Sequence, residues 1–365
     1  MCGIESEETG GSSSMSCRDP AVGDRPVRGY GRRQKLRTQG LAAVMRFADT
    51  VDALIEAPIV TSFSNVGHAV RSRVDDWRPL WSYDMRHRTV VITGPTSGLG
   101  EAGARFFARL GARLVLVARN PAKGENLAAD LASRSGNEHI STVVADMGDL
   151  DSVRAAVQTI SARHHPVDAL IHNAGSLFNE RRNQPDGTET TMAVHVVGPF
   201  LMTGLMLGSL GDGSRVITMS SGGMYSVPLT VGGIEMDEDA YRGPTQYAIA
   251  KRSQVTLNEM WAERVPHVRF HAMHPGWADT PGVVESLPGF HRLVGPFLRT
   301  PRQGSDTMVW LAADDGSPAQ TTGKFWLDRR IREIHKLGRT RRSDTPDRRR
   351  RLWDWVAERA GWNLP

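Results

Sequence analysis

The chain has 365 residues, 39% of them hydrophobic, and a formal net charge of +5. This length suffices for one large α/β domain with extensions. Its two cysteines, Cys2 and Cys17, lie near the N-terminus, which excludes a disulfide-built core and fits a reducing compartment. No run of about 18 apolar residues predicts a transmembrane helix, and no apolar segment of a secretory signal occurs in residues 1–40. We expect a cytoplasmic protein, with peripheral membrane contact as an alternative.

Two segments precede the main domain. Residues 1–40 are rich in Gly, Ser and Arg, a composition that predicts disorder. Residues 41–85 include LAAVMRFADTVDALIEAPIV, whose apolar residues recur with helical spacing. This predicts a helical extension, for which three roles remain open: packing on the main domain, joining a dimer, or lying on a membrane surface.

Strands and helices alternate regularly over residues 86–328, the predicted main domain. The predicted strands are 88–94, 112–119, 140–146, 167–175, 214–221, 268–276 and 323–328. The predicted helices are 98–111, 121–134, 150–164, 188–210, 244–264 and 302–313. This alternation predicts βαβ units, and therefore an α/β fold with a doubly wound parallel sheet flanked by helices, a Rossmann fold.

A glycine-rich turn, TGPTSGLG (93–100), follows the first predicted strand and opens the first helix. Gly94, Gly98 and Gly100 would let the backbone turn tightly and approach a pyrophosphate at the helix N-terminus. A purely structural turn is the alternative. If the turn binds a dinucleotide, we expect further contacts from its other residues, Thr96, Ser97 and Leu99.

The end of the second predicted strand indicates which nicotinamide cofactor is used. An acidic residue there would bind the ribose hydroxyls of NAD, whereas an arginine accommodates the 2′-phosphate of NADP. In this chain Ala118 occupies that position and Arg119 follows it. The sequence therefore favours NADP(H) over NAD(H), the alternative being that Arg119 is merely exposed.

Tyr247 and Lys251 lie one helical turn apart in YAIAK, on the same face of a predicted helix. A tyrosine with its usual pKa of about 10 is a poor acid-base catalyst at neutral pH. A fixed ammonium group beside it would favour the phenolate and lower that pKa. The pair alone is weak support for catalysis, because it also occurs by chance.

Six motifs occur in a fixed order along residues 86–328: the glycine turn, ADM, HNAG, SSGGM, YAIAK and HPGWADT. In this order they resemble the short-chain dehydrogenase/reductase family. Three longer stretches narrow the resemblance to one subgroup: RVITMSSGGM (215–224), YAIAKRSQVTLNEMWAE (247–263) and MHPGWADTPGVVESLPGF (273–290).

The resemblance implies a role for each matched residue. Ser221 would hydrogen-bond the substrate oxygen, Tyr247 would be the general acid-base, and Lys251 would hold the nicotinamide ribose and lower the tyrosine pKa. The implied cofactor contacts are Asp146 and Met147 at the adenine, Asn173, Ala174 and Gly175 at the ribose, and Pro275, Gly276 and Thr280 at the nicotinamide. The resemblance also implies a dimer or tetramer, assembled through the tyrosine-bearing helix and its neighbour.

The chain departs from the family pattern at His195, in AVHVVGPF (193–200), where the family usually has an asparagine that holds a proton-relay water. Histidine binds water and titrates near neutral pH, so it would serve a relay. Alternatively, the histidine ring would occupy the place of the relay water and break the relay. A third possibility is a buried histidine that only hydrogen-bonds a backbone carbonyl. His172 is a milder exchange, in front of the intact Asn173-Ala174-Gly175.

No histidine has ligand spacing with a carboxylate or thiol, so we expect no metal site. The segment 277–299 is a candidate lid over the substrate. Its apolar residues predict a small hydrophobic carbonyl or alcohol as substrate, unless they only bury the segment against the sheet: Trp277, Val283, Val284, Leu287, Phe290, Leu293 and Phe297.

Residues 329–365 carry 12 Lys and Arg against 5 Asp and Glu, a net +7, which leaves about −2 for the rest. The stretch 348–362 predicts a short helix that docks on its own protein through Leu352, Trp353, Trp355 and Val356. Binding to an anionic membrane or nucleic acid is the alternative, although nothing beyond charge supports nucleic acid.

Together these features predict an NADP(H)-dependent oxidoreductase that interconverts a hydrophobic carbonyl and its alcohol. The rival hypothesis, motivated by His195 and the basic tail, is an NADP(H)-binding sensor or scaffold with little or no turnover.

Overall fold

The computed structural model describes residues 48–56, 59–286, 289, 292 and 294–364. The chain divides into two compact units, residues 1–50 and 51–365. The fold and the candidate site belong to the second unit.

An eight-stranded sheet organises this unit, with strand order β3-β2-β1-β4-β5-β6-β7-β8. Neighbouring strands are parallel from β3 to β7, and β8 runs antiparallel to β7. This confirms the predicted doubly wound fold, whose ligand crevice opens where the strand order reverses, between β1 and β4. The strands are β1 (Thr89–Thr93), β2 (Arg113–Ala118), β3 (Ile140–Val144), β4 (Val167–His172), β5 (Leu210–Met219), β6 (Arg269–Met273), β7 (Lys324–Leu327) and β8 (Arg330–Ile331).

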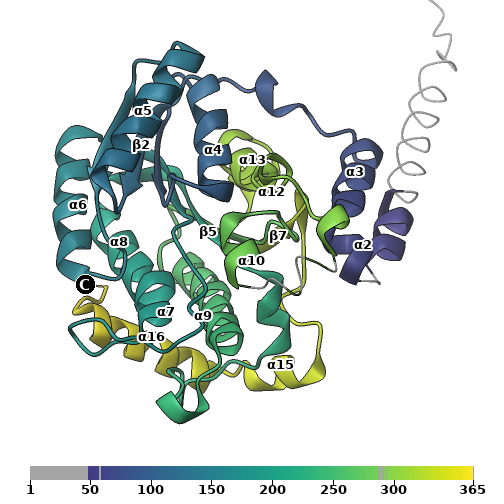
Figure 1. The fold of residues 1–365 in the computed structure, drawn as a ribbon, viewed down its shortest axis with the longest axis vertical. Coiled ribbons are helices and arrows are strands. Elements are labelled where there is room, and N and C mark those ends of the chain that lie inside the picture. Colours follow the sequence, from purple (N-terminus) through teal and green to yellow (C-terminus); the bar gives the residue numbers. More distant parts are fainter. Residues whose placement is uncertain (1–47, 57–58, 287–288, 290–291, 293, 365) are drawn as a thin grey trace, which may run out of the picture. The chain divides into compact units, whose positions relative to one another are not determined.

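Helices cover both faces of the sheet, as Figure 1 shows. Alternate residues of a strand point to opposite faces, so Val90 and Ile92 enter one core and Val91 the other. The first core includes α4 (Gly98–Arg109), α5 (Pro121–Ser135) and α13 (Asp306–Ala313). The second includes α6 (Leu150–Arg163), α8 (Gly198–Met206), α9 (Gly243–Arg264) and α16 (Pro346–Ala360).

Local sequence signals set several helix ends. The Asn120 side chain accepts a hydrogen bond from the Lys123 amide and is followed by a proline, which together begin α5. Asp149 caps α6 in the same way. The left-handed glycines Gly136 and Gly361 end α5 and α16.

The helix predicted at 188–210 is shorter and interrupted. It consists of α7 (Thr190–Met192), a π-helical turn (Ala193–Val197) and α8, and β5 already begins at Leu210. The π-turn inserts an extra residue beside His195, a feature often found at functional sites. Sequence periodicity also missed short elements that tertiary contacts define, namely β8, α14 (Ser317–Gln320) and α15 (Gly338–Ser343).

The described part of the N-terminal extension packs on the main domain. It contains α2 (Ile59–Phe63), α3 (Asn65–Val74) and the 3₁₀ turn η1 (Leu80–Ser82), whereas residues 41–47 lie outside the described part. Arg71 of α3 is buried and pairs with Asp328, directly after β7, at 2.7 Å. In Figure 1 these helices lie beside β7 and α10 (Pro281–Ser286).

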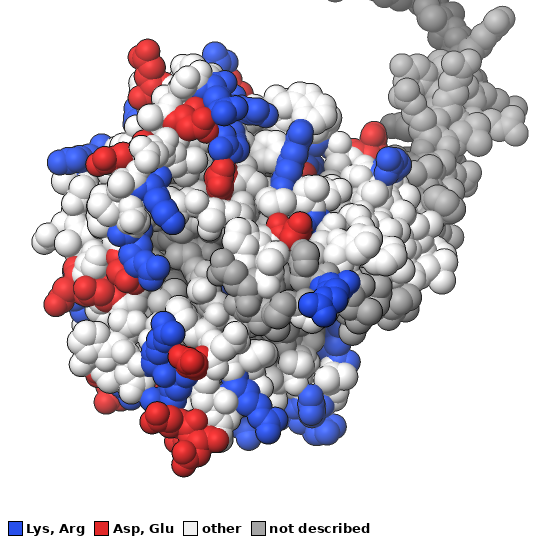
Figure 2. Space-filling view, viewed as in Figure 1, with Lys and Arg blue, Asp and Glu red and all other residues white. Residues whose placement is uncertain are grey.

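The C-terminal helix α16 docks on α8 and α9. Trp353 is buried, with its ring 4.9 Å from those of Phe200 and Trp261. Trp355, predicted on the same apolar side, is only partly buried. Arg349 pairs with Asp344 and Glu259, each at 2.6 Å. Acidic and basic side chains intermingle on the face in Figure 2.

Candidate active site

The glycine turn joins β1 to α4 at the strand-order reversal. Gly94 and Gly98 have φ of +63° and +56°, and a Cβ on Gly100 would lie 2.1 Å from the Gly94 carbonyl oxygen. These positions therefore require glycine. Ser97, the N-cap of α4, makes no side-chain capping bond, and the first N–H groups of a helix lack intrahelical acceptors. The turn thus fits the pyrophosphate of a dinucleotide.

Thr93 and Asn173 brace this turn. The Asn173 side-chain amide donates to the carbonyls of Thr93 and Gly94 at 3.1 and 2.9 Å. The backbone amides of Asn173 and Ala174 donate to Thr93 Oγ1 at 3.1 and 3.0 Å. In this structure the Asn173 side chain therefore holds the turn. Sequence reasoning missed Thr93, whose signal is a threonine at the carboxyl end of a buried strand, directly before the glycine turn.

Residues predicted near the adenine take different positions. Met147 is 5% exposed and belongs to the second core. Asp146 accepts from the Gly148 amide at 2.9 Å. Arg119 directly follows β2, its side chain is 77% exposed, and its guanidinium lies 3.9 Å from Asp146. Arg119 is thus accessible to a ligand at the carboxyl edge of the sheet.

Ser221, Tyr247 and Lys251 come together at the end of β5. Ser221 is the N-cap of a 3₁₀ turn, η3 (Gly222–Ser226), and its side chain hydrogen-bonds Tyr247 on α9. Lys251 Nζ lies 5.3 Å from the centroid of the Tyr247 ring. The structure thus brings together the three side chains that the sequence singled out.

Two nearby residues of the same types have other partners. The Tyr241 hydroxyl lies 3.1 Å from a Glu189 carboxylate oxygen and 3.2 Å from the Thr191 hydroxyl. The Ser220 hydroxyl donates to the Lys251 backbone carbonyl at 3.1 Å. These contacts distinguish both residues from Ser221 and Tyr247.

The expected lowering of the Tyr247 pKa does not occur in this structure. Burial raises the pKa of Tyr247 to about 12, and the Ser221 hydrogen bond opposes this only in part. Burial also lowers the pKa of Lys251 to about 7, and its ammonium donates to the Met219 carbonyl at 2.7 Å. Lys251 is buried and Tyr247 is partly buried, and removal from water disfavours the charged form of each.

The buried lysine gives a test in stability. Lys251 has a folded pKa of about 7 against an ordinary 10.5, so between these pH values the unfolded chain binds the extra proton. The free energy of unfolding should therefore rise as the pH rises from about 7 to 10.5. Below about pH 7 the full destabilisation caused by burying the protonated lysine should be present. We expect the Tm of wild type to rise relative to that of Lys251→Met in matched buffers. Parallel Tm profiles would contradict the shift.

The His195 ring is a buried group satisfied by backbone. Its Nε2 lies 2.8 Å from the Ser176 carbonyl oxygen and 3.3 Å from the Ser176 amide nitrogen, so both contacts are with backbone. A Cβ on Gly175 would lie 2.2 Å from His195 Cε1, and the ring meets Tyr247 edge-on at 5.2 Å. Burial holds the pKa of His195 well below its usual value. The ring is therefore neutral and fills space beside Tyr247.

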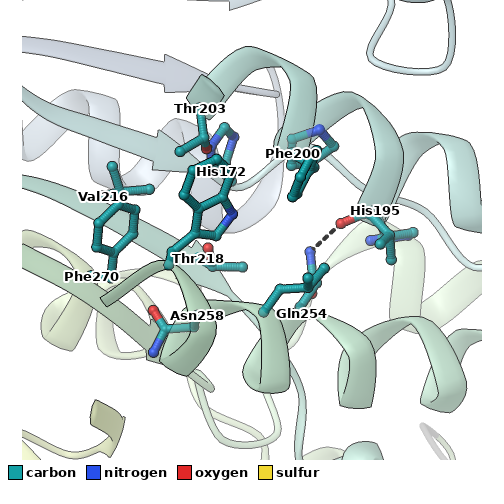
Figure 3. A pocket seen from close by; sticks show the side chains of 13 residues that line it. His172, His195, Phe200, Thr203, Val216, Thr218, Gln254, Asn258 and Phe270 are labelled. Carbon is teal, nitrogen blue, oxygen red and sulfur yellow. Dashed lines mark hydrogen bonds between the residues drawn. The ribbon is translucent and has the colours of Figure 1, made fainter. Parts of the chain in front are cut away.

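Gln254, which the sequence did not single out, binds the His195 backbone. Its Nε2 donates to the His195 carbonyl at 2.6 Å, as Figure 3 shows. Both residues border a cavity of about 30 Å³. His172 also lines this cavity, and its Nε2 lies 2.8 Å from the Thr203 hydroxyl. A substrate site typically measures about 300–1,000 Å³, so this cavity is no substrate pocket.

The loop 275–280 faces the glycine turn. Gly276 has a φ of +74°, and a Cβ on Gly98 would lie 3.3 Å from the Thr280 methyl group. In the candidate lid, Val284 and Phe297 are 43% and 48% exposed, so these two do not bury the segment. Trp277 is partly buried against the cluster that contains Phe63. The side chains of the four remaining lid residues lie outside the described part, namely Val283, Leu287, Phe290 and Leu293.

Within the described ranges, no group of three or more His, Cys, Asp or Glu residues is placed to hold a metal ion. Among the same residues, no helix is both long and apolar enough to span a membrane.

The fold and this site define a dinucleotide-binding oxidoreductase. The family described as short chain dehydrogenase matches residues 88–288. The chain is 37% identical over 250 residues to human dehydrogenase/reductase SDR family member 12, covering 68% of this chain and 78% of that protein. It therefore belongs to the short-chain dehydrogenase/reductase family. The bovine protein of the same name is also 37% identical, over 75% of this chain and 86% of its own length.

A more distant relative matches in sequence, and solved structures match in fold. Mouse polyprenol dehydrogenase is 29% identical, over 76% of this chain and 85% of that protein. An uncharacterized protein from Mycobacterium Paratuberculosis is 25% identical with a TM-score of 0.62, covering 79% and 99% of the two chains. A short chain dehydrogenase from Burkholderia cenocepacia, solved with NADP, is 18% identical with a TM-score of 0.54, covering 65% and 94%.

Proposed function

We propose that the protein is an NADP(H)-dependent oxidoreductase that interconverts a hydrophobic carbonyl compound and its alcohol, with Tyr247 as general acid-base. The observation that carries this proposal is the convergence of Ser221, Tyr247 and Lys251 at the end of β5, on the same carboxyl edge of the parallel sheet as the glycine turn. Fold alone would not support it, because one fold serves many functions.

In this mechanism the bound cofactor supplies a hydride or accepts one. Ser221 hydrogen-bonds the substrate oxygen and Tyr247 donates its hydroxyl proton to that oxygen as negative charge develops there. A Tyr247 pKa of about 12 keeps the hydroxyl protonated at neutral pH, which suits the reductive direction. Lys251 would bind the nicotinamide ribose. His195, neutral and backbone-bound, acts here by positioning the Tyr247 ring.

We assign the other cofactor contacts to the glycine turn and to the loops that come directly after strands. We assign the pyrophosphate to Gly94–Gly100, including Thr96, Ser97 and Leu99. Ala174 and Gly175 would lie at the ribose, and Pro275, Gly276 and Thr280 at the nicotinamide. NADP in the Burkholderia structure and the exposed Arg119 support NADP(H) over NAD(H).

Arg119 tests the cofactor preference. We expect Arg119→Ala to raise the KM for NADPH about 10- to 100-fold, with little change in the KM for NADH. This is the loss of affinity expected when a hydrogen bond to a charged group is removed. The matched control is Arg113→Ala, at the opposite end of β2, which should alter neither KM. Equal effects of Arg119→Ala on both cofactors would contradict the assignment.

The substrate proposal rests on the chain's apolar lid and on its relatives. Retinol dehydrogenase 12 and polyprenol dehydrogenase, named for hydrophobic alcohols, are 30% and 29% identical to the chain. We therefore propose a hydrophobic aldehyde or ketone and its alcohol. A dimer or tetramer would need a surface other than α8 and α9, because α16 covers them. Cytoplasmic location and peripheral membrane contact stay predictions.

The deciding experiment follows NADPH consumption by wild type with a panel of hydrophobic aldehydes and ketones, and measures NADPH binding separately by fluorescence. Turnover supports the reductase. Tight NADPH binding without turnover across a broad panel favours the rival sensor or scaffold.

A further inference from the structure

Phe63, at the end of α2, lies against two segments that border the candidate reaction centre. Its ring centroid is 4.3 Å from that of His274 and 5.9 Å from that of Trp277. A Cβ on Gly222, directly after Ser221, would lie 2.6 Å from the Phe63 ring. Phe63 is 4% exposed. One side chain of the N-terminal extension therefore contacts both the serine turn and the loop 275–280.

Backbone hydrogen bonds join the same parts. The Trp277 amide donates to the Phe63 carbonyl at 2.7 Å, and the Arg299 amide donates to the Trp277 carbonyl at 2.7 Å. The Asp279 amide in turn donates a hydrogen bond to the Arg299 carbonyl at 2.8 Å. The loop is thus held between the extension on one side and the strand-like segment at Arg299 on the other.

The buried Arg299 guanidinium links the extension to the loop a second time. It donates to the carbonyls of Ser62 and Ser64, each at 3.0 Å, and to the Pro275 carbonyl at 3.1 Å. Asp328 accepts two further bonds from it, at 2.6 and 2.8 Å. The planar fork of arginine can serve all these acceptors at once, which a lysine ammonium cannot.

The other extension helix is fixed to the same carboxylate. Arg71 of α3 pairs with Asp328 at 2.7 Å, and with Asp52 and Glu56 at 2.7 and 2.9 Å. A Cβ on Gly276 would lie 2.3 Å from Arg299 Nε and 2.6 Å from the Phe63 carbonyl oxygen. The loop backbone therefore fits against the extension only with glycine at this position.

We propose that residues 61–71 are a positioning element of the reaction centre, with Phe63 as its main contact, and that they hold the loop 275–280 in the conformation that receives the nicotinamide half of the cofactor. This inference rests on the proposed function. Loops that carry function are otherwise mobile, and an ordered loop avoids the entropy cost of ordering on binding. The extension would thus contribute to cofactor binding without touching the cofactor.

The test compares Phe63→Ala and Phe63→Leu with a control in the same extension, Trp77→Ala, whose ring packs on His68 and Arg329. Hydrogen exchange of the Trp277 and Arg299 amides is measured on the protein alone. We expect Phe63→Ala to speed their exchange about tenfold and to raise the Kd for NADPH about tenfold. Its kcat/KM should fall by up to about 100-fold. Phe63→Leu should restore most of each loss, and Trp77→Ala should change none of them.

Unchanged exchange at these two amides in Phe63→Ala, with a Tm loss like that of Trp77→Ala, would overturn the proposal and leave the extension a purely stabilising segment. If Phe63→Ala fails to fold, Phe63→Val, which loses more of the ring contact than Phe63→Leu does, decides by the same exchange measurement. A wild type that binds no NADPH would refute the proposed function, while exchange would still decide whether the extension orders the loop.

Discussion

Phe in place of Tyr247 should abolish most turnover while leaving NADPH binding intact. The substitution removes the only proton donor that the proposed mechanism places at the substrate oxygen besides Ser221, and keeps the ring that packs against His195. General acid catalysis contributes about 10²–10⁴-fold, so we expect kcat to fall by that factor. Turnover is measured as the steady-state rate with the best carbonyl substrate of the panel. NADPH binding is measured as the Kd by fluorescence.

The matched control is Tyr241→Phe. Its hydroxyl bonds Glu189 and Thr191 rather than Ser221, so kcat should stay near the wild-type value. A Tyr247→Phe protein that keeps its kcat would reject Tyr247 as the general acid-base. Parallel loss of NADPH binding would instead indicate a damaged cofactor site.

Truncating Trp353 should cause the largest loss of stability among single changes in the C-terminal helix. The side chain is 4% exposed, packs on Phe200 and Trp261, lies under the Arg264 guanidinium, and donates from Nε1 to Asn363 at 3.0 Å. A buried Trp→Ala change typically costs about 3–5 kcal/mol. Urea unfolding of Trp353→Ala should therefore show a much lower midpoint.

Trp355→Ala provides the comparison on the same helix. Its ring is only partly buried and stacks under Arg359 at 5.6 Å, so its loss should be small. Equal midpoints for the two variants would show that α16 does not depend on its docked face. Because α16 covers α8 and α9, we also expect Trp353→Ala to loosen the helix that carries Tyr247.

Much of the fold could be predicted from the sequence because its signals are local. Apolar strands followed by amphipathic helices indicated the parallel sheet, and all seven predicted strands occur in the structure. The glycine turn could be recognised in the sequence because its backbone requires glycine. The φ values and close contacts in the structure exclude other residues at these positions. Helix ends were accurate where capping side chains specify them, as at Asn120, and poor before β5, where no such signal stops the helix.

The sequence by itself thus determined the family, the sheet, and which serine, tyrosine and lysine would meet. Tertiary structure alone decided their environment. Burial reverses the expected pKa direction at Tyr247, because desolvation depends on everything packed around the group. The His195 ring binds the Ser176 carbonyl, and Phe63 reaches the loop at Trp277, through contacts between segments far apart in the chain. Sequence periodicity records which face of an element is apolar, but not which distant element covers it.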